Sequence, residues 1–342
     1  MNTDNSYHDI KNNKSEIPPV SVLLSACNGE KYLKDQVDSI FSQTYKNIIL
    51  YVRDDGSTDG TWELLNKLQK KYGSDRMNII KGKNKGFGKS FMELLKYADE
   101  GDYWAFSDQD DVWFPEKIER GVKWLTAEES RYAENSQLDG TFYSREQNGN
   151  LSKCKFVPLM YHSAFKNVDE SLNPLNDYLP PKYRYDFRRS ITDCLHMGFS
   201  DIINKDLRSM MLEGDPKILT THDHWAEMLV MEFGKVYFDP HISCLHRRLN
   251  SSISGLSMKN RIRWLIGAMK GDYDFKSCVH EFKIHFYDKM KQEDRKFIWM
   301  FSIKRGHYNI AKQFAKAFYP KRWRPSLSSE LVMRTLMLIG KI

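Results

Sequence analysis

The sequence of 342 residues predicts an α/β protein in which helices cover both faces of a parallel β-sheet. Three observations predict this class. Short apolar runs rich in β-branched residues alternate with segments whose apolar residues recur at helical spacing. A cluster of polar residues follows three of the expected strands. Hydrophobic residues make up 41% of the chain and aromatic residues 13%, which supplies a core and excludes a disordered protein.

The expected elements follow in order from residue 20. Residues 20–26 (VSVLLSA) read as a buried strand, and apolar residues from Tyr32 to Phe41 then mark one face of a helix. Thr58–Thr61 offers caps for the second helix, and Pro115 suits the first turn of the fourth. We expect strands at residues 20–26, 48–53, 77–81 and 103–107. We expect helices at residues 30–43, 61–71, 88–98 and 115–125.

Polar clusters stand directly after three of these strands. They are Cys27–Glu30, Asp54–Asp59 and Asp108–Asp111. In a parallel sheet, ligands bind at the carboxyl ends of the strands. We therefore expect the three clusters to meet at one edge of the sheet and to form a ligand site there.

The third cluster places Asp108, Asp110 and Asp111 within four residues, with Asp54 and Asp55 expected nearby. Carboxylates repel one another unless a cation compensates their charge. Oxygen ligands of this kind suit Mg²⁺ or Mn²⁺ shared with a substrate phosphate. The alternative is that these residues cap the following helix or form turns, but their position after a strand favours a ligand site.

The glycine-rich turn at residues 82–89 (GKNKGFGK) lacks the residue order of a Walker A phosphate loop. Its Lys83 and Asn84 are candidates for contact with a diphosphate. A solvated loop before a helix explains the same residues equally well.

Net charge is distributed unevenly along the chain. Residues 256–342 hold 19 Lys or Arg against 7 Asp or Glu, a balance of +12, whereas the remainder has a balance of −5. This shift predicts a boundary near Gly255. We expect a polar N-terminal segment at residues 1–17, a body at residues 18–255 and a basic, mainly helical region at residues 256–342.

The sequence gives three indications of compartment. Its five cysteines are scattered without a C-x-x-C pair, which predicts neither a disulfide framework nor a zinc cluster. The polar first residues show no signal peptide, and no apolar run approaches the roughly 20 residues of a spanning helix. A cytoplasmic location is the expectation.

Four segments resemble the motifs of family 2 glycosyltransferases in order and spacing. They are Val20–Gly29, Asp54–Thr61, Asn84–Gly88 and Phe106–Trp113. The Ser-Asp-Gln-Asp-Asp-Val-Trp form of the last segment is most similar to a bacterial rhamnosyltransferase-like branch that builds cell-wall and capsular polysaccharides. Thr221–Trp225, Phe233–Val236 and Leu245–Asn250 resemble later motifs of that branch more loosely. The resemblance covers residues 18–255.

The resemblance implies a GT-A fold, in which a Rossmann-like nucleotide-binding sheet merges with an acceptor-binding half. It implies that the first two strand-end loops hold the base and ribose of a nucleotide-sugar, with either Asp54 or Asp55 in contact. The expected donor-binding residues are Ala26, Asn28, Glu30, Asp54, Asp55, Lys83, Asn84, Asp108 and Arg247.

The resemblance also implies the chemistry. Asp108 and Asp110 match the family's Asp-x-Asp, which binds Mg²⁺ or Mn²⁺, with Asp110 as the direct ligand. Family members invert configuration, so one carboxylate suffices as base, and Asp223 occupies the matching position. By pattern alone, Asp223 would be an N-terminal helix cap with His222 and His224 at the surface.

Two segments depart from the branch. A histidine usual in its Arg-containing motif is replaced by Leu249, which cannot bind a metal or diphosphate, so that His246 or Arg247 and Arg248 would have to supply charge. Residues 192–197 (TDCLHM) also lack the family's small, glycine-rich form. The acceptor is therefore less well defined than the donor.

The basic tail mixes arginine and tryptophan, as in Arg263-Trp264 and Lys321–Arg324. This composition favours docking on an anionic membrane, which a lipid-linked acceptor would make useful. Nucleic acid would attract the same charges, although no nucleic-acid-binding motif accompanies them. The third explanation is a helical bundle that packs on the body and leaves a basic face in solvent.

The sequence thus predicts an inverting, metal-dependent glycosyltransferase, with dTDP-rhamnose as the favoured donor and a glycan or lipid-linked acceptor. The first alternative keeps the fold and uses a UDP-hexose. Nucleotidyl transfer would require a glycine-rich basic loop after the first strand, and residues 25–30 lack one. A non-enzymatic membrane- or nucleic-acid-binding protein would leave the strand-end carboxylates unexplained.

Overall fold

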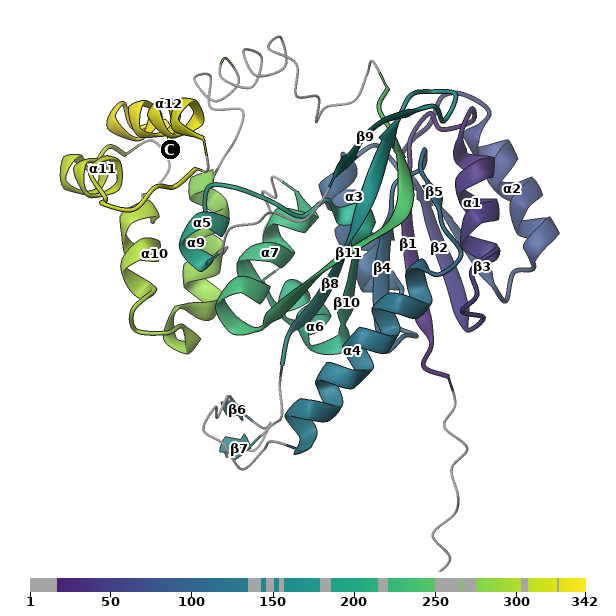
Figure 1. Cartoon of the computed structure of the whole chain (residues 1–342), viewed down its shortest axis with the longest axis horizontal. Coiled ribbons are helices and arrows are strands. Elements are labelled where there is room, and N and C mark those ends of the chain that lie inside the picture. Colours follow the sequence, from purple (N-terminus) through teal and green to yellow (C-terminus); the bar gives the residue numbers. More distant parts are fainter. Residues whose placement is uncertain are drawn as a thin grey trace, which may run out of the picture.

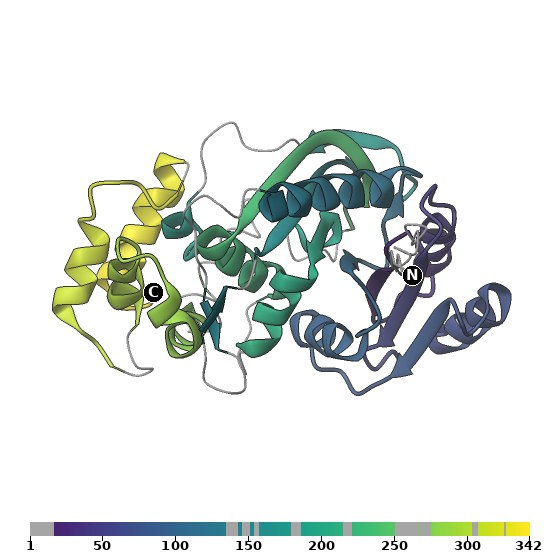
Figure 2. The ribbon, with the colours of Figure 1, turned by 90° about the horizontal axis from the view of Figure 1, so that it is seen from below.

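The computed structural model describes most of the chain. Its described residues are 17–134, 143–145, 151–153, 157–178, 186–214, 221–249, 266, 275–302, 307–324 and 326–342. A twisted β-sheet with its covering helices forms one part of the molecule, and the C-terminal helices form the other (Figure 1). Figure 2 shows the two parts at opposite ends of the long axis.

Four parallel strands form one side of the main sheet, in the order β3-β2-β1-β4. Their bounds are β1 Val20–Ala26, β2 Ile48–Asp54, β3 Met77–Lys81 and β4 Tyr103–Ser107. All four expected strands are therefore confirmed. The apolar residues of β1 and β4 are buried on both faces, as a parallel sheet covered by helices requires, whereas β3 at the edge of the sheet is only partly buried.

The sheet continues beyond β4 in the order β10-β8-β11-β5, and β9 pairs with β8. The bounds are β5 Val112–Trp113, β8 Leu159–Val168, β9 Pro174–Tyr178, β10 Asp201–Asn204 and β11 Lys235–Arg247. Because β10 runs antiparallel to β4, the sheet is mixed, which corrects the expectation of a purely parallel sheet. β6 Tyr143–Arg145 and β7 Leu151–Lys153 form a separate pair.

Helices cover both faces of the sheet, as predicted. One face packs against α1 Leu33–Phe41, α2 Thr61–Tyr72 and α4 Lys117–Glu134. The other packs against α3 Phe87–Tyr97, α6 Lys205–Glu213 and α7 His222–Phe233. The first helix begins three residues later than predicted and the fourth extends nine residues further, to Glu134. Two short helical turns, α5 Phe187–Ser190 and Gly198–Ser200, precede β10.

The C-terminal region is helical, as expected. It contains α9 Phe275–Phe286, a 3₁₀ turn at Tyr287–Lys289, α10 Arg295–Phe301, α11 Ile310–Ala317 and α12 Leu327–Leu338. Phe282 and Phe286 of α9 pack around Trp225 of α7, and one hydrophobic cluster runs from β1 to Ile342. The predicted boundary at Gly255 lies outside the described residues.

The structure corrects one expectation about the basic tail. Trp323 is fully buried, and its indole N–H donates to the Lys316 carbonyl over 2.9 Å, so it is a core residue and not a membrane-facing one. Arg261, Arg263, Trp264, Lys304 and Arg305 lie outside the described residues. Within the described part of the chain, no helix is both long and apolar enough to cross a membrane.

Candidate active site

The three strand-end loops meet at one edge of the sheet, as the sequence predicts. Asn28 has a φ of 52°, and its backbone N–H donates to the Ser57 hydroxyl over 2.9 Å. Its side-chain carbonyl accepts the N–H of Thr58 over 2.8 Å. Gln109 joins the third loop to the first, because it both accepts from and donates to the backbone of Cys27.

Ala26 and Glu30 help to shape this edge. Ala26 is the buried last residue of β1 and lies in register with Asp54. The Glu30 carboxylate accepts the Gly60 N–H over 3.0 Å, while the Glu30 N–H donates to Asp59 over 3.3 Å. A Cβ atom at Gly60 would collide with a Glu30 carboxylate oxygen, so the exposed Glu30 side chain would have to move. Glu30 therefore orders the second loop.

Asp54 and Asp55 have different surroundings, although both are buried. Asp55 forms an ion pair with Arg53 and accepts the N–H groups of Lys85 and Gly86, each over 2.9 Å. Asp54 accepts the Ser57 N–H over 3.0 Å through one oxygen, and its Oδ2 has no hydrogen-bond partner among the described residues. Asp54 is thus the member of the pair with an oxygen to offer a ligand.

Lys83 and Asn84 belong to the loop that Asp55 holds. Arg53 donates to the Lys83 carbonyl over 3.0 Å, and the Asn84 amide lies 3.5 Å from the Cys27 sulfur. Both residues are exposed. The loop therefore adjoins the same edge and presents an ammonium and an amide to solvent.

A cluster of acidic groups with one histidine lies where β4 ends and β11 passes by. The ligand atoms of Asp108, Asp111 and His246 all lie within 4.8 Å of one another. Asp111 is buried, and its Oδ1 accepts from His246 Nδ1 over 2.9 Å. Asp110, the residue predicted to be the direct metal ligand, is not part of this group.

The pKa shifts show how strongly these carboxyls interact. Asp108 keeps some exposed surface, yet burial of its carboxyl together with Asp111 and Asp110 raises its pKa well above the usual value. Burial and Asp111 raise the pKa of Asp110 to about 6. Burial opposes a charge on His246, but Asp111 and Asp108 outweigh it and raise the pKa of the imidazole. The site therefore concentrates negative charge that a cation would stabilise.

The residues present fit a hard divalent cation. Asp111 Oδ2 is buried and has no hydrogen-bond partner in the described part of the chain. Two carboxylates and an imidazole form a donor set that Mg²⁺ and Mn²⁺ accept. Asp108, Asp111 and His246 would hold such an ion, which would supply charge neutralisation for a diphosphate.

Arg247 links the end of β11 to the third loop and to α1. Its guanidinium donates to the Asp110 carbonyl over 2.9 Å and to the Asp35 carboxylate of α1 over 2.8 Å. The guanidinium carbon also lies 4.8 Å from the centroid of the Tyr32 ring. These contacts make it a residue that positions the third loop. The sequence suggests His246 only as one substitute for the histidine missing at Leu249. In the structure, His246 lies with Asp108 and Asp111.

Asp223 lies in the first turn of α7, but it is not the cap. Thr221 caps the helix by accepting the His224 N–H over 3.3 Å, and Asp223 Oδ1 accepts the same N–H over 2.8 Å. His222 and His224 are buried, which corrects the expectation that they lie at the surface. The charge of Asp223 is the smallest of the contributions that raise the pKa of Asp108.

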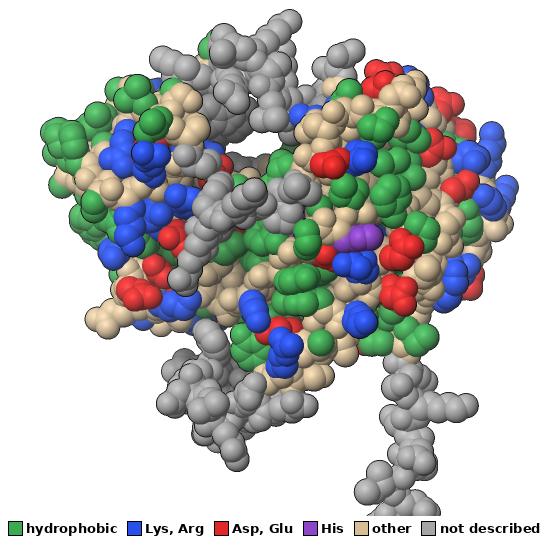
Figure 3. All heavy atoms as spheres, viewed as in Figure 1, with side chains coloured by type: hydrophobic (Ala, Val, Ile, Leu, Met, Phe, Trp, Pro, Cys, Tyr) green, Lys and Arg blue, Asp and Glu red, His purple; other side chains and the backbone are tan. Residues whose placement is uncertain are grey.

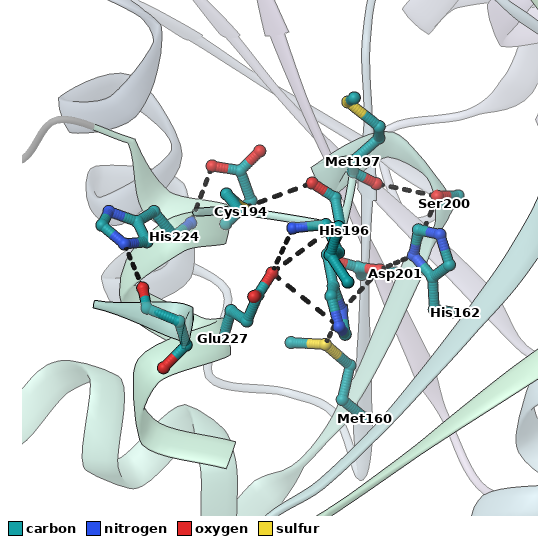
Figure 4. A network of polar contacts seen from close by, with 12 residues as sticks. Met160, His162, Cys194, His196, Met197, Ser200, Asp201, His224 and Glu227 are labelled. Carbon is teal, nitrogen blue, oxygen red and sulfur yellow. Dashed lines mark hydrogen bonds and ion pairs between the residues drawn. The ribbon is translucent and has the colours of Figure 1, made fainter. Parts of the chain in front are cut away.

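A buried polar network connects α7 to the strands beneath it (Figure 4). Glu227, one helical turn after Asp223, accepts the N–H groups of Leu195 and His196 over 2.8 and 3.1 Å. The His196 imidazole lies 3.7 Å from Asp201, which is paired with His162 at 2.6 Å. Residues 192–197, the segment that departs from the family pattern, are thereby held by α7.

The fold and the edge site define the class of this protein. It is an α/β protein whose polar strand-end loops converge at the carboxyl ends of its parallel strands. The expected architecture, a Rossmann-like parallel sheet merged with a second half and followed by helices, is confirmed.

Comparison with known proteins gives one family match. Residues 21–157 match the model of Glycosyl transferase family 2.

Two curated relatives show the range of similar proteins. The chain is 38% identical to the dTDP-rhamnosyl transferase RfbG of Shigella flexneri, over 30% of this chain and 36% of the relative. It is 37% identical to the UDP-Glc:alpha-D-GlcNAc-diphosphoundecaprenol beta-1,3-glucosyltransferase WfaP of Escherichia coli, over 32% of this chain and 42% of the relative. The matched part therefore spans less than half the length of either relative.

Among solved structures, the chain is similar to the mannosyltransferase PcManGT from Pyrobaculum calidifontis in complex with GDP-Man and Mn²⁺. The TM-score is 0.49 and the sequence identity 13%, over 96% of this chain and 86% of that chain.

The Glu227 contacts generate a prediction about stability. Glu227→Ala leaves two inward-facing N–H groups without their acceptor, so the free energy of unfolding should fall by about 2–4 kcal/mol. Urea denaturation followed by circular dichroism measures the change. Glu227→Gln, which keeps an acceptor oxygen, should lose less, and Glu170→Ala at an exposed ion pair should change little. Equal stability of Glu227→Ala and the wild type would contradict the structural role of Glu227.

Proposed function

We propose that this protein is an inverting glycosyltransferase that moves a sugar from a nucleotide-sugar to a glycan or lipid-linked acceptor in bacterial surface polysaccharide synthesis. The observation that carries the proposal is the acidic cluster at the carboxyl edge of the sheet, where Asp108, Asp111 and His246 lie together. The family match of residues 21–157 supports it. The favoured donor is dTDP-rhamnose, and the acceptor would be reached from the cytoplasmic face of the membrane.

The donor would bind along the three joined loops. The spare oxygen of Asp54 is suited to accept from a nucleobase or ribose, and the loop of Lys83 and Asn84 offers donors to a phosphate. Asn28, Glu30, Asp55 and Arg247 keep these loops in place through hydrogen bonds within the protein. Mg²⁺ or Mn²⁺ at the acidic cluster would stabilise the charge on the departing diphosphate.

Transfer would proceed by a single displacement at the anomeric carbon. An acceptor hydroxyl oxygen forms the new bond to C1 as the bond from C1 to the diphosphate oxygen breaks, and the leaving group takes the electron pair. Asp223 would accept the hydroxyl proton, which makes the oxygen a better nucleophile. Its place in the first turn of α7 and its effect on the pKa of Asp108 support this assignment.

A UDP-hexose is the second candidate donor. The curated relatives include both a dTDP-rhamnosyl transferase and a glucosyltransferase that uses UDP-Glc, so the family match does not select between them. A screen of the purified protein with dTDP-rhamnose, UDP-glucose, UDP-GlcNAc and GDP-mannose, each with Mn²⁺, Mg²⁺ or chelator, tests both. Metal-dependent release of nucleoside diphosphate supports the proposal. No release from any donor, with or without an acceptor, would favour a non-enzymatic role.

The metal ligands can be identified by single substitutions. If Asp110 is the direct ligand that the sequence predicts, Asp110→Ala should remove metal-dependent activity and leave the fold intact, whereas the structure groups Asp108, Asp111 and His246 as the ligands. Asp108→Ala and Asp111→Asn should weaken Mn²⁺ binding about tenfold or more, because each removes an oxygen donor. Calorimetric titration with Mn²⁺ alone measures binding, and Asp102→Ala, an exposed aspartate before β4, is the control. Full activity of Asp110→Ala would move the role of direct ligand to Asp108 and Asp111.

Metal binding should depend on pH in a defined direction. The pKa of Asp110 is raised to about 6 and that of Asp108 is also raised, so protons compete with the ion at mildly acidic pH. Mn²⁺ affinity should therefore rise from about pH 5 towards neutral pH, as the carboxyls lose their protons. Titrations at several pH values measure this. An affinity that is constant over the range would contradict binding at this cluster.

The base is tested by Asp223→Asn. Donor and Mn²⁺ binding should survive, whereas transfer should fall by at least about a hundredfold, the scale of losing a general base. Initial rates of transfer and calorimetric binding of the donor separate the two effects. Retained transfer would move the base to another carboxylate. Asp193, which is paired with Arg324, would be the next to test.

A further inference from the structure

Apolar side chains gather on the outer surface of α11 and α12. Ile310, Phe314 and Phe318 follow one another at four-residue intervals along one face of α11 and into its C-cap, and the rings of Phe314 and Phe318 stack at 5.5 Å. Leu327 and Leu331 repeat the spacing on α12. Phe318 is 67% exposed and Leu331 69% exposed. We call these five residues the apolar face.

The apolar face is not needed to hold the helices in place. The inner side of α11 is buried through Gln313, Lys316 and Ala317, and the inner side of α12 through Met333, Leu336 and Met337. Packing of the bundle therefore uses the opposite sides of both helices. The two rows lie on helices that contact each other, and exposed apolar surface of this kind marks an interaction site.

The charges around the apolar face have one sign. Residues 307–342 contain seven Lys or Arg and one acidic residue, Glu330. Glu330 is buried, where it pairs with Arg334 and accepts the N–H groups of Trp323 and Arg324. Lys321, Arg322 and Lys341 are exposed. Figure 3 shows hydrophobic side chains over α11 and α12 with blue basic groups beside them.

We infer that the apolar face of α11 and α12 docks on an anionic lipid bilayer, with its aromatic and aliphatic side chains in the interface and the surrounding Lys and Arg at the headgroups. Apolar residues flanked by basic ones are the composition of helices that lie in the membrane surface. A second copy of the chain is the less suitable partner, because a symmetric contact would bring the same positive charges together. The inference rests on the membrane-facing acceptor of the proposed function and names the surface that serves it.

The test uses the full chain and vesicles without donor or acceptor, so that its failure leaves the transferase proposal standing. Flotation is measured with vesicles of phosphatidylcholine alone and with vesicles that also contain phosphatidylglycerol. Binding should require phosphatidylglycerol and should weaken at high salt, because screening shortens the range of the attraction.

Substitutions separate the apolar and the basic contributions. Phe314→Ser with Phe318→Ser, and separately Lys321→Glu with Arg322→Glu, should each reduce partitioning about tenfold or more. Leu175→Ser, at a residue 57% exposed on β9, is the matched control and should bind like the wild type. Circular dichroism shows that each variant is folded.

Three outcomes would overturn the inference. The first is equal binding to both kinds of vesicle, and the second is no binding at low salt. The third is undiminished binding of both double variants. Sedimentation without lipid tests whether a second copy of the chain occupies the apolar face instead. Self-association of the wild type that is lost in the double variant Phe314→Ser with Phe318→Ser would assign the face to a second copy.

Discussion

Repulsion among the carboxylates at one edge of the sheet is the constraint that organises the rest of this structure. Each aspartate there has a different counterpart. Arg53 and two backbone N–H groups satisfy Asp55, whereas His246 and the N–H of Arg247 share one oxygen of Asp111. What remains is the second oxygen of Asp54, the second oxygen of Asp111 and the carboxyl of Asp108, whose pKa is raised. The edge therefore keeps residual charge that its own residues do not compensate.

The same constraint gives β11 its role in the site. A charge cluster at the end of β4 needs basic partners, and β11 brings His246 and Arg247 to it while its own backbone pairs with β5 and β8. Arg247 then reaches α1 through Asp35. The second half of the chain thus completes the site of the first half. The short strand β5 lies directly after Asp111 and fixes that residue against β11.

Sequence patterns predicted the parts that depend on local order. The four parallel strands and the convergence of Asn28, Asp54 and Asp108 follow from apolar runs and from the rule that polar residues after such strands share an edge. The pairing of Asp111 with His246 joins residues far apart in the chain, and no local period reports such a contact. Trp323 was misjudged for the same reason, because its basic neighbours suggested a surface and only the packing of α10 to α12 buries it.

The helix that carries the expected base also joins the site to the C-terminal bundle. Asp223 and Glu227 lie on one side of α7, whereas Trp225 and Phe233 pack against Phe282 and Phe286 of α9. The bundle continues through α10 to α11 and α12, whose outer surface is apolar and basic. A bilayer beneath that surface would meet a unit packed continuously up to α7. Close-packed interiors have few voids and are hard to compress. The bundle would therefore set the height of α7 above the membrane. The same helices would then present the base at a fixed distance from a lipid-linked acceptor.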